Sequence, residues 1–247
     1  MRIELLFQLE KPELPKDNKS TWISYLKHVI SQCNDGKYFD RYFSQKRSKD
    51  YSFGLVLSKP VFGDEKIILS DTNIKMIFSA SDKNKTGMIF FSAFIGDKGK
   101  KFRMPDGNAM VLKSIRLLKE KVITSRQIIV KTVVGGGLVI REHDRSSNKD
   151  IYFTVNDDQF VEKANNTLKI QSKEAGFSDE ISDTLNIQPL NCKKVVVKQY
   201  GVYVDVSIGL FQLEGDEELL QYFYQAGLGS KHSMGYGLID IVSQDVN

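Results

Sequence analysis

Residues 227–237, Gly-Leu-Gly-Ser-Lys-His-Ser-Met-Gly-Tyr-Gly, combine residue types that can bind a polyanion. The glycines permit backbone conformations with positive φ, and they let phosphate oxygens approach main-chain N–H groups closely. Lys231 adds a positive charge, and Ser230 and Ser233 add hydroxyl donors. We therefore expect this glycine-rich loop to contact phosphate groups. The alternative is a long, flexible connection between a helix and a strand.

The order of the elements around the glycine-rich loop argues against a nucleotide-hydrolysing P-loop. In dinucleotide-binding and P-loop segments a strand leads into the glycines and a helix follows. Here the pattern predicts a helix before the loop, over 217–226, and a strand after it, over 237–242. The sequence Gly-Lys-Ser/Thr that ends a P-loop is missing as well.

Three histidines are present, and histidine is the side chain best suited to proton transfer near neutral pH. His28 lies on a predicted helix at the flank of its apolar stripe, where it is a catalytic candidate or an ordinary boundary residue. His143 follows a predicted strand, in a charged segment that we interpret as a solvated turn. His232 lies at the centre of the glycine-rich loop, where ligand binding is favoured over proton transfer.

The composition is that of a soluble globular protein. The chain has 247 residues, of which 41% are hydrophobic and 27% charged, so a folded core is expected. The net charge is only +4, so any basic surface must come from clustering. Cys33 and Cys192 show no metal-like spacing and are predicted to be reduced, which fits a cytoplasmic protein. We expect no bound metal and no cofactor. No apolar run approaches the roughly 20 residues of a membrane span, so we expect no membrane association.

The second half of the chain has the element order of a ferredoxin-like domain, which RNA-recognition modules also use. The predicted elements are a strand over 127–134 that resumes at 138–141, a short strand over 152–155, a helix over 158–174, strands over 193–197 and 201–212, a helix over 217–226 and a strand over 237–242. Asp216 is the expected N-cap of the last helix, and Gly227 is its expected stop.

The first half is less regular. Its pattern predicts a strand over 2–10, a helix from about 20 to 34, and strands over 51–57, 66–70, 74–80, 88–95 and 111–121. Residues 37–50 lack a clear period and are interpreted as a loop or short helix. A second helix is not evident. The predicted fold is α+β, with two tandem ferredoxin-like (RRM-like) domains over 1–122 and 123–247.

With these elements assigned, the C-terminal segment resembles the signature of the CRISPR-associated repeat-RNA endoribonuclease family. Members of that family end in a helix, a loop of the form Gly-x-Gly-x-x-x-Ser-x-Gly-[Phe/Tyr]-Gly, and a final strand. The matching positions here are Gly227, Gly229, Ser233, Gly235, Tyr236 and Gly237. The sequence departs from the family at His232, where Arg or Asn is frequent, and at Gly136-Gly137, where Ser-Pro is frequent.

The resemblance implies an endoribonuclease that binds CRISPR repeat RNA and cuts this precursor to mature guide RNAs. It implies a metal-independent reaction that leaves 2′,3′-cyclic phosphate and 5′-hydroxyl ends. The expected partners are the repeat RNA, other subunits of a CRISPR effector complex, and a second copy of the chain in a homodimer. Two alternatives stay open, namely a relative that binds repeat RNA without cutting it and an unrelated RNA-binding or scaffold protein.

Metal-free RNA cleavage needs a base for the 2′-hydroxyl, an acid for the leaving 5′-oxygen and a cation for the phosphorane. The family often places a catalytic Tyr or His near His28, and a histidine just after the first helix. Residues 38–50 contain no histidine, so nearby Tyr and Lys side chains are the substitutes that this sequence offers. The candidate catalytic residues are therefore His28, Tyr38, Tyr42, Lys46 and Lys49. The alternative is that the aromatic residues pack and the lysines bind phosphate.

Cations and the glycine-rich loop supply the candidates for RNA binding. Each phosphate contact should make the affinity more dependent on salt. The candidates are Arg41, Arg47, Arg126, Lys131, Arg141, Gly229, Ser230, Lys231, His232 and Ser233, with Lys46 and Lys49 as further cations. The alternative for each cation is an ordinary solvent-facing position, and for His143 an RNA contact is the alternative to solvent.

Overall fold

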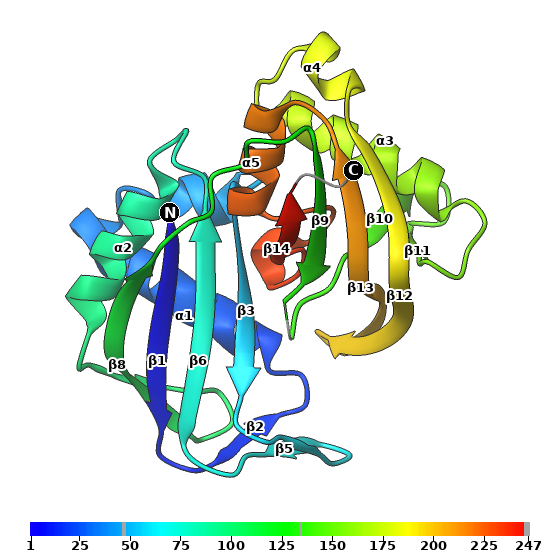
Figure 1. The fold of residues 1–247 in the computed structure, drawn as a ribbon. Coiled ribbons are helices and arrows are strands. Elements are labelled where there is room, and N and C mark those ends of the chain that lie inside the picture. The colour runs from blue at the N-terminus through cyan, green and yellow to red at the C-terminus, as the bar shows by residue number, and fades with distance from the viewer. Residues whose placement is uncertain (46–47, 134, 245–247) are drawn as a thin grey trace.

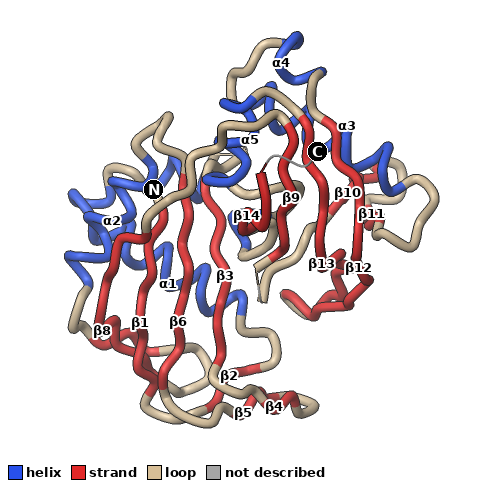
Figure 2. The backbone as a smooth tube through the Cα atoms, viewed as in Figure 1, coloured by secondary structure: helices blue, strands red, loops and turns tan. Residues whose placement is uncertain are grey.

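A computed structural model describes residues 1–45, 48–133 and 135–244, and its two main antiparallel sheets lie side by side (Figure 1). The main helices pack against the sheets and leave the strands open on the opposite side, as the backbone trace shows (Figure 2). The first sheet uses residues up to Leu118, and the second begins at Gln127. No helix within these described ranges is long and apolar enough to cross a membrane.

The first half has a ferredoxin-like topology. Its main elements are β1 (Arg2–Leu9), α1 (Lys19–Gln32), β3 (Tyr51–Leu57), β6 (Asn73–Ala80), α2 (Thr86–Asp97) and β8 (Ala109–Leu118). The sheet order is β3-β6-β1-β8, with the short β7 (Lys101–Arg103) added at the edge next to β8. Alternate residues of β1, such as Ile3, Leu5 and Phe7, are fully buried, because successive side chains of a strand point to opposite faces of the sheet.

One prediction for this half is wrong, because the segment 88–95 is part of helix α2 and not a strand. Its sequence is almost continuously apolar, and such a run can be a buried strand or a buried helix. The buried residues Phe90, Ala93, Phe94 and Asp97 recur at spacings of three and four, which is the period of a helix face. This helix is the second one that a ferredoxin-like half requires.

Several short elements complete the first half. A small three-stranded sheet has the order β2-β5-β4, and two irregular helices follow α1. Their bounds are β2 (Glu13–Pro15), β4 (Val61–Phe62), β5 (Lys66–Ile68), η1 (Cys33–Gly36) and η2 (Asp40–Ser44). The last of these is a single π-helical turn inside the segment predicted to be a loop or short helix.

The second half repeats the topology. Its elements are β9 (Gln127–Thr132), β10 (Ile140–Asp144), β11 (Lys149–Phe153), α3 (Phe160–Glu174), α4 (Asp179–Asp183), β12 (Asn186–Gln199), β13 (Val202–Glu214), α5 (Glu217–Ala226), η3 (His232–Met234) and β14 (Ile239–Gln244). The four-stranded sheet has the order β12-β13-β9-β14, and β10 and β11 form a separate hairpin inserted before α3. The predicted α+β fold with two ferredoxin-like halves is confirmed.

Arg2 connects the two halves directly. Its guanidinium is almost completely buried, donates a 2.6 Å hydrogen bond to the Ile239 carbonyl and lies 3.1 Å from the Asp240 carboxylate. The same group lies 4.5 Å from the centre of the Tyr224 ring, a cation–π contact. The first strand of the chain is thereby fixed against the last one.

Candidate functional site

The glycine-rich loop 227–237 packs between the two halves, against β3. A Cβ atom at Gly227 would lie 2.7 Å from the Ser52 side chain, and one at Gly235 would lie 2.8 Å from the Phe53 ring. Both glycines have positive φ, +90° and +88°. Glycine is therefore required here for its conformation and because the two halves approach so closely.

The main-chain amides of the loop glycines are used within the protein. Gly227 donates to Phe223, Gly235 to His232 and Gly237 to Gly137, in each case to the carbonyl oxygen. The Gly229 amide donates to the side chain of Gln171, with a distance of 2.9 Å. These four amides are therefore engaged within the protein, and phosphate binding by the side chains or other amides of this loop stays a prediction.

Lys19, at the start of α1, holds the loop from the first half. Its ammonium donates to the carbonyls of Gly235 at 2.6 Å and Gly135 at 3.1 Å, and lies 4.2 Å from the centre of the Tyr236 ring. Burial lowers the pKa of Lys19 to about 7. Sequence reasoning missed this residue, because a lysine in the first turn of a helix has the pattern of a solvated side chain.

His232 is the second buried contact between the loop and the first half. Only 5% of the residue is exposed, Nδ1 lies 3.0 Å from the Tyr51 carbonyl oxygen, and Nε2 lies 3.3 Å from the Ser48 hydroxyl. Burial lowers the pKa of this histidine. The ring forms part of the surface that connects the halves, and any RNA contact by His232 stays a prediction.

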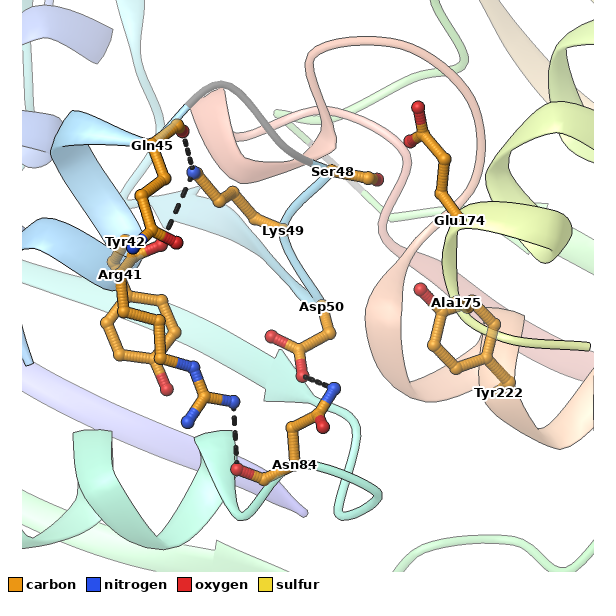
Figure 3. Close-up of a pocket in the computed structure, with 10 residues that line it drawn as sticks. All are labelled: Arg41, Tyr42, Gln45, Ser48, Lys49, Asp50, Asn84, Glu174, Ala175 and Tyr222. Carbon is orange, nitrogen blue, oxygen red and sulfur yellow. Dashed lines mark hydrogen bonds between the residues drawn. The ribbon is translucent and has the colours of Figure 1, made fainter.

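Two adjoining pockets form a groove where the halves meet, and they share Ser48, Lys49 and Glu174. One pocket lies between the η2–β3 segment and the second half, where Glu174 at the end of α3 and Tyr222 of α5 form its opposite wall (Figure 3). The other pocket runs along the glycine-rich loop. The groove brings together most of the predicted site residues, which are Arg41, Tyr42, Lys49, Arg141, Gly229, Ser230, Lys231, His232 and Ser233.

Tyr42 lines the groove but its hydroxyl is engaged inside the protein. The residue is 2% exposed, and its hydroxyl donates to Thr86 Oγ1 at 3.0 Å. Thr86 in turn donates to the Asp50 carboxylate at 2.8 Å. Burial raises the pKa of Tyr42, so the hydroxyl keeps its proton at neutral pH.

The cations of this pocket are held by main-chain carbonyls. The Lys49 ammonium donates to the carbonyl of Gln45 at 2.6 Å and to that of Arg41 at 3.5 Å (Figure 3). The Arg41 guanidinium donates to the Asn84 carbonyl at 3.0 Å. These bonds orient both positive charges along one wall of the groove.

Other predicted residues lie elsewhere. His28 lies on α1, and its Nε2 is 3.3 Å from the Asp97 carboxylate on α2. Tyr38 packs against the hydrophobic core of the first half. Two cations of the second half are placed apart from the groove, Arg126 beside Glu217 on α5 and Lys131 in a separate pocket over the four-stranded sheet. Lys46 and Arg47 lie outside the described residues.

Comparison with known proteins identifies the relatives of this fold. The profile of the family described as "CRISPR associated protein Cas6, C-terminal" matches residues 118–241. The chain is 24% identical over 243 residues to the CRISPR-associated endoribonuclease Cas6 1 of Methanocaldococcus jannaschii, covering 97% of this chain and 92% of the relative. It is 22% identical over 194 residues to the putative CRISPR-associated endoribonuclease-like protein Cas6nc of Pyrococcus horikoshii, covering 76% and 77%.

Solved structures share the whole fold. A structure described as an RAMP protein binding different RNA substrates superposes with a TM-score of 0.82 at 18% identity, over 98% of this chain and 100% of that one. The product of a Cas6-related gene from Pyrococcus furiosus superposes with a TM-score of 0.81 at 18% identity, over 99% of each chain. At such low identities these likenesses establish the arrangement of the two halves and nothing about individual side chains.

Proposed function

Because the chain belongs to the family of the CRISPR-associated protein Cas6, we propose that it binds CRISPR repeat RNA and cuts it to mature guide RNAs. The observation that carries this proposal is the groove between the halves, where Lys49 from one half and Arg141 and Lys231 from the other line adjoining pockets. Cations on both walls of one groove suit a phosphodiester backbone, which carries a negative charge at every nucleotide.

The proposed reaction is a metal-independent transesterification. The 2′-hydroxyl loses its proton to a base, its oxygen attacks the adjacent phosphorus, and the bond from phosphorus to the 5′-oxygen breaks. The leaving oxygen takes up a proton, which gives 2′,3′-cyclic phosphate and 5′-hydroxyl ends. Cations of the groove would stabilise the negative charge that develops on the phosphorane.

The sequence-predicted catalytic residues differ in how well the geometry supports them. Lys49 is the best supported, because it lines both pockets and could stabilise the phosphorane. Tyr42 also lines the groove, but its hydroxyl would have to leave Thr86 before it could reach RNA. His28, Tyr38 and Lys46 stay proposals on the family resemblance alone.

A second candidate function is repeat-RNA binding without cleavage. It is favoured by the lack of a histidine in residues 38–50 and by the engaged hydroxyl of Tyr42. In this case the same groove would hold the RNA, and the chain would act as a binding subunit.

Incubation of the purified protein with its own repeat RNA in EDTA distinguishes these functions. Cleavage to a fragment with a 2′,3′-cyclic phosphate supports the endoribonuclease, and the cyclic end is identified by mass spectrometry. Tight binding without cleavage supports the binding subunit. A failure to bind the repeat RNA more tightly than a scrambled RNA of equal length would contradict both.

Assembly with other CRISPR effector subunits, self-association as a homodimer and a cytoplasmic location are further proposals. Copurification of a tagged chain from its native cell tests the first. Light scattering of the purified chain, with and without repeat RNA, tests the second. A species of about twice the 28.1 kDa chain mass is the expected result for a homodimer.

A further inference from the structure

The hairpin of β10 and β11 carries a cluster of polar side chains on one face. In its register Arg141 is opposite Tyr152, and His143 is opposite Asp150. Because side chains alternate along a strand, and directly opposed residues point to the same side, these four side chains share one face of the hairpin. The intervening residue Glu142 points the other way, where it pairs with Lys163 of α3 at 2.8 Å.

Asp150 is the centre of this cluster. Its carboxylate lies 3.0 Å from His143 Nδ1 and accepts hydrogen bonds from Arg141 at 3.1 Å and from the Tyr152 hydroxyl at 3.3 Å. The Lys231 ammonium of the glycine-rich loop lies 3.9 Å away. Partial burial alone would raise the pKa of Asp150, but the hydrogen bonds from His143 and Arg141 outweigh it and lower the pKa, so the carboxylate is ionised at neutral pH.

This arrangement prepares His143 to accept a proton. The carboxylate fixes the hydrogen on Nδ1, so that the lone pair of the neutral ring is on Nε2. The side chain is 44% exposed, and within the described chain Nε2 has no hydrogen-bond partner. The two other histidines differ, because His232 uses both ring nitrogens within the protein and His28 directs Nε2 to Asp97.

The cluster is continuous with the groove. Arg141 and Lys231 belong to the cluster through Asp150, and both also line the pocket along the glycine-rich loop. An RNA phosphate bound in that pocket would therefore lie near two cations, Arg141 and Lys231, and both cations contact the Asp150 carboxylate that bonds to His143. His143 is linked to the groove through the Asp150 carboxylate, which contacts His143, Arg141 and Lys231.

We propose that His143 is the general base of the RNA cleavage, with Asp150 as its positioning residue and Arg141 and Lys231 as the cations that stabilise the phosphorane. This inference rests on the proposed endoribonuclease function. His143 Nε2 takes the proton of the 2′-hydroxyl, the 2′-oxygen bonds to phosphorus, and the bond to the 5′-oxygen breaks. The 5′-oxygen takes a proton from water, and the imidazolium returns its proton to solvent.

The test compares single-turnover cleavage and equilibrium RNA binding in EDTA for the wild-type chain, four variants of the hairpin and His28→Ala. We expect His143→Ala and His143→Gln to slow cleavage about 100-fold or more, the usual contribution of a general base, with affinity changed less than about threefold. Asp150→Asn should slow cleavage about tenfold. Lys149→Ala removes a charge from the opposite face of the same hairpin and should leave the rate unchanged.

Added imidazole should restore part of the cleavage rate of His143→Ala. It should restore none of the rate of His143→Gln, whose side chain fills the site.

The outcomes distinguish a failure of the endoribonuclease function from a failure of the His143 assignment. A wild-type chain that binds repeat RNA without cutting it contradicts the endoribonuclease function and, with it, any base. If the wild-type chain cuts and His143→Ala cuts equally fast, or if only His28→Ala slows the reaction, His143 is not the base and the endoribonuclease function stands. Thermal melting of each variant shows that it is folded, and a slow His143→Ala variant that imidazole does not rescue also overturns the assignment.

Discussion

Lys19 and Gly235 are separated by 216 residues in the sequence, yet the Lys19 ammonium donates a 2.6 Å hydrogen bond to the Gly235 carbonyl. The same ammonium reaches the Gly135 carbonyl, so one side chain of the first half holds two glycine segments of the second. Both segments border the surfaces where the halves meet. The geometry of the groove therefore depends on a buried lysine side chain that is not itself part of the groove.

This burial makes stability depend on pH in a defined direction. The pKa of Lys19 falls from an ordinary 10.5 to about 7 in the folded chain. Between these values the unfolded chain holds the proton and the folded chain has released it, so the stability contributed by this residue rises with pH. From pH 7 to 10 we expect the free energy of unfolding of the wild type to rise relative to that of Lys19→Met, by up to about 1.4 kcal/mol per pH unit. Urea unfolding at each pH measures it, and a constant difference would contradict the prediction.

Close packing at Gly237 should make this position intolerant of any side chain. A Cβ atom here would lie 2.0 Å from the Leu228 carbonyl oxygen, and φ is +68°. We expect Gly237→Ala to lower the free energy of unfolding by about 3 kcal/mol or more, because strain and displacement of the loop add to each other. Gly201 is the matched control, since its φ is +77° but nothing lies within 4 Å of its Cβ position, and Gly201→Ala should cost only about 1 kcal/mol. Equal losses in the two variants would refute a packing role for Gly237.

The cations of the groove should determine the salt dependence of RNA binding. Each phosphate contact on single-stranded RNA contributes about −0.7 to the slope of log affinity against log salt concentration. Lys231→Ala and Arg141→Ala should each make the slope shallower by about that amount. Lys101→Ala, at the far edge of the five-stranded sheet, should leave it unchanged. Titrations of labelled repeat RNA at several salt concentrations give the slopes, and unchanged slopes for both groove variants would show that RNA binds elsewhere.

Tyr42 should contribute to stability through its hydroxyl. Tyr42→Phe removes the donor to Thr86 from a buried chain that ends at Asp50, and we expect a loss of about 1 kcal/mol in the free energy of unfolding. Tyr38→Phe is the control, because no described hydrogen bond involves the Tyr38 hydroxyl and the residue is only partly buried. Chemical denaturation compares the two. If Tyr42→Phe keeps full stability but loses cleavage, the hydroxyl acts on RNA instead.

Local signals in the sequence were sufficient to predict the secondary structure of much of the second half. Asp216 caps α5 by accepting a hydrogen bond from the Glu218 amide, and Gly227 ends that helix, both as predicted. The segment 88–95 shows where local signals fail, since a buried helix and a buried strand have the same apolar composition and only the surrounding sheet decides between them.

The two main segments of the candidate site could be predicted from the sequence, but the contacts that join them to the rest of the protein could not. Groove residues near Tyr42 and near Lys231 were both identified, because aromatic, basic and glycine-rich patterns are visible in the sequence. The roles of Lys19, Arg2 and Asp150 were missed. Each is an ordinary charged residue in its local context, and its partners are brought to it only by tertiary structure.

The contact between Arg2 and Ile239 also constrains how the chain reaches its final form. These residues are 237 positions apart, so the ribosome releases one long before it makes the other. The first half can form its own helices and strands during synthesis, but the guanidinium of Arg2 has no carbonyl of β14 to bond until the ribosome has made Ile239. The contact that joins β1 to β14 is consequently formed late, and a nascent chain that stops short of β14 lacks both this contact and the fourth strand of the second sheet.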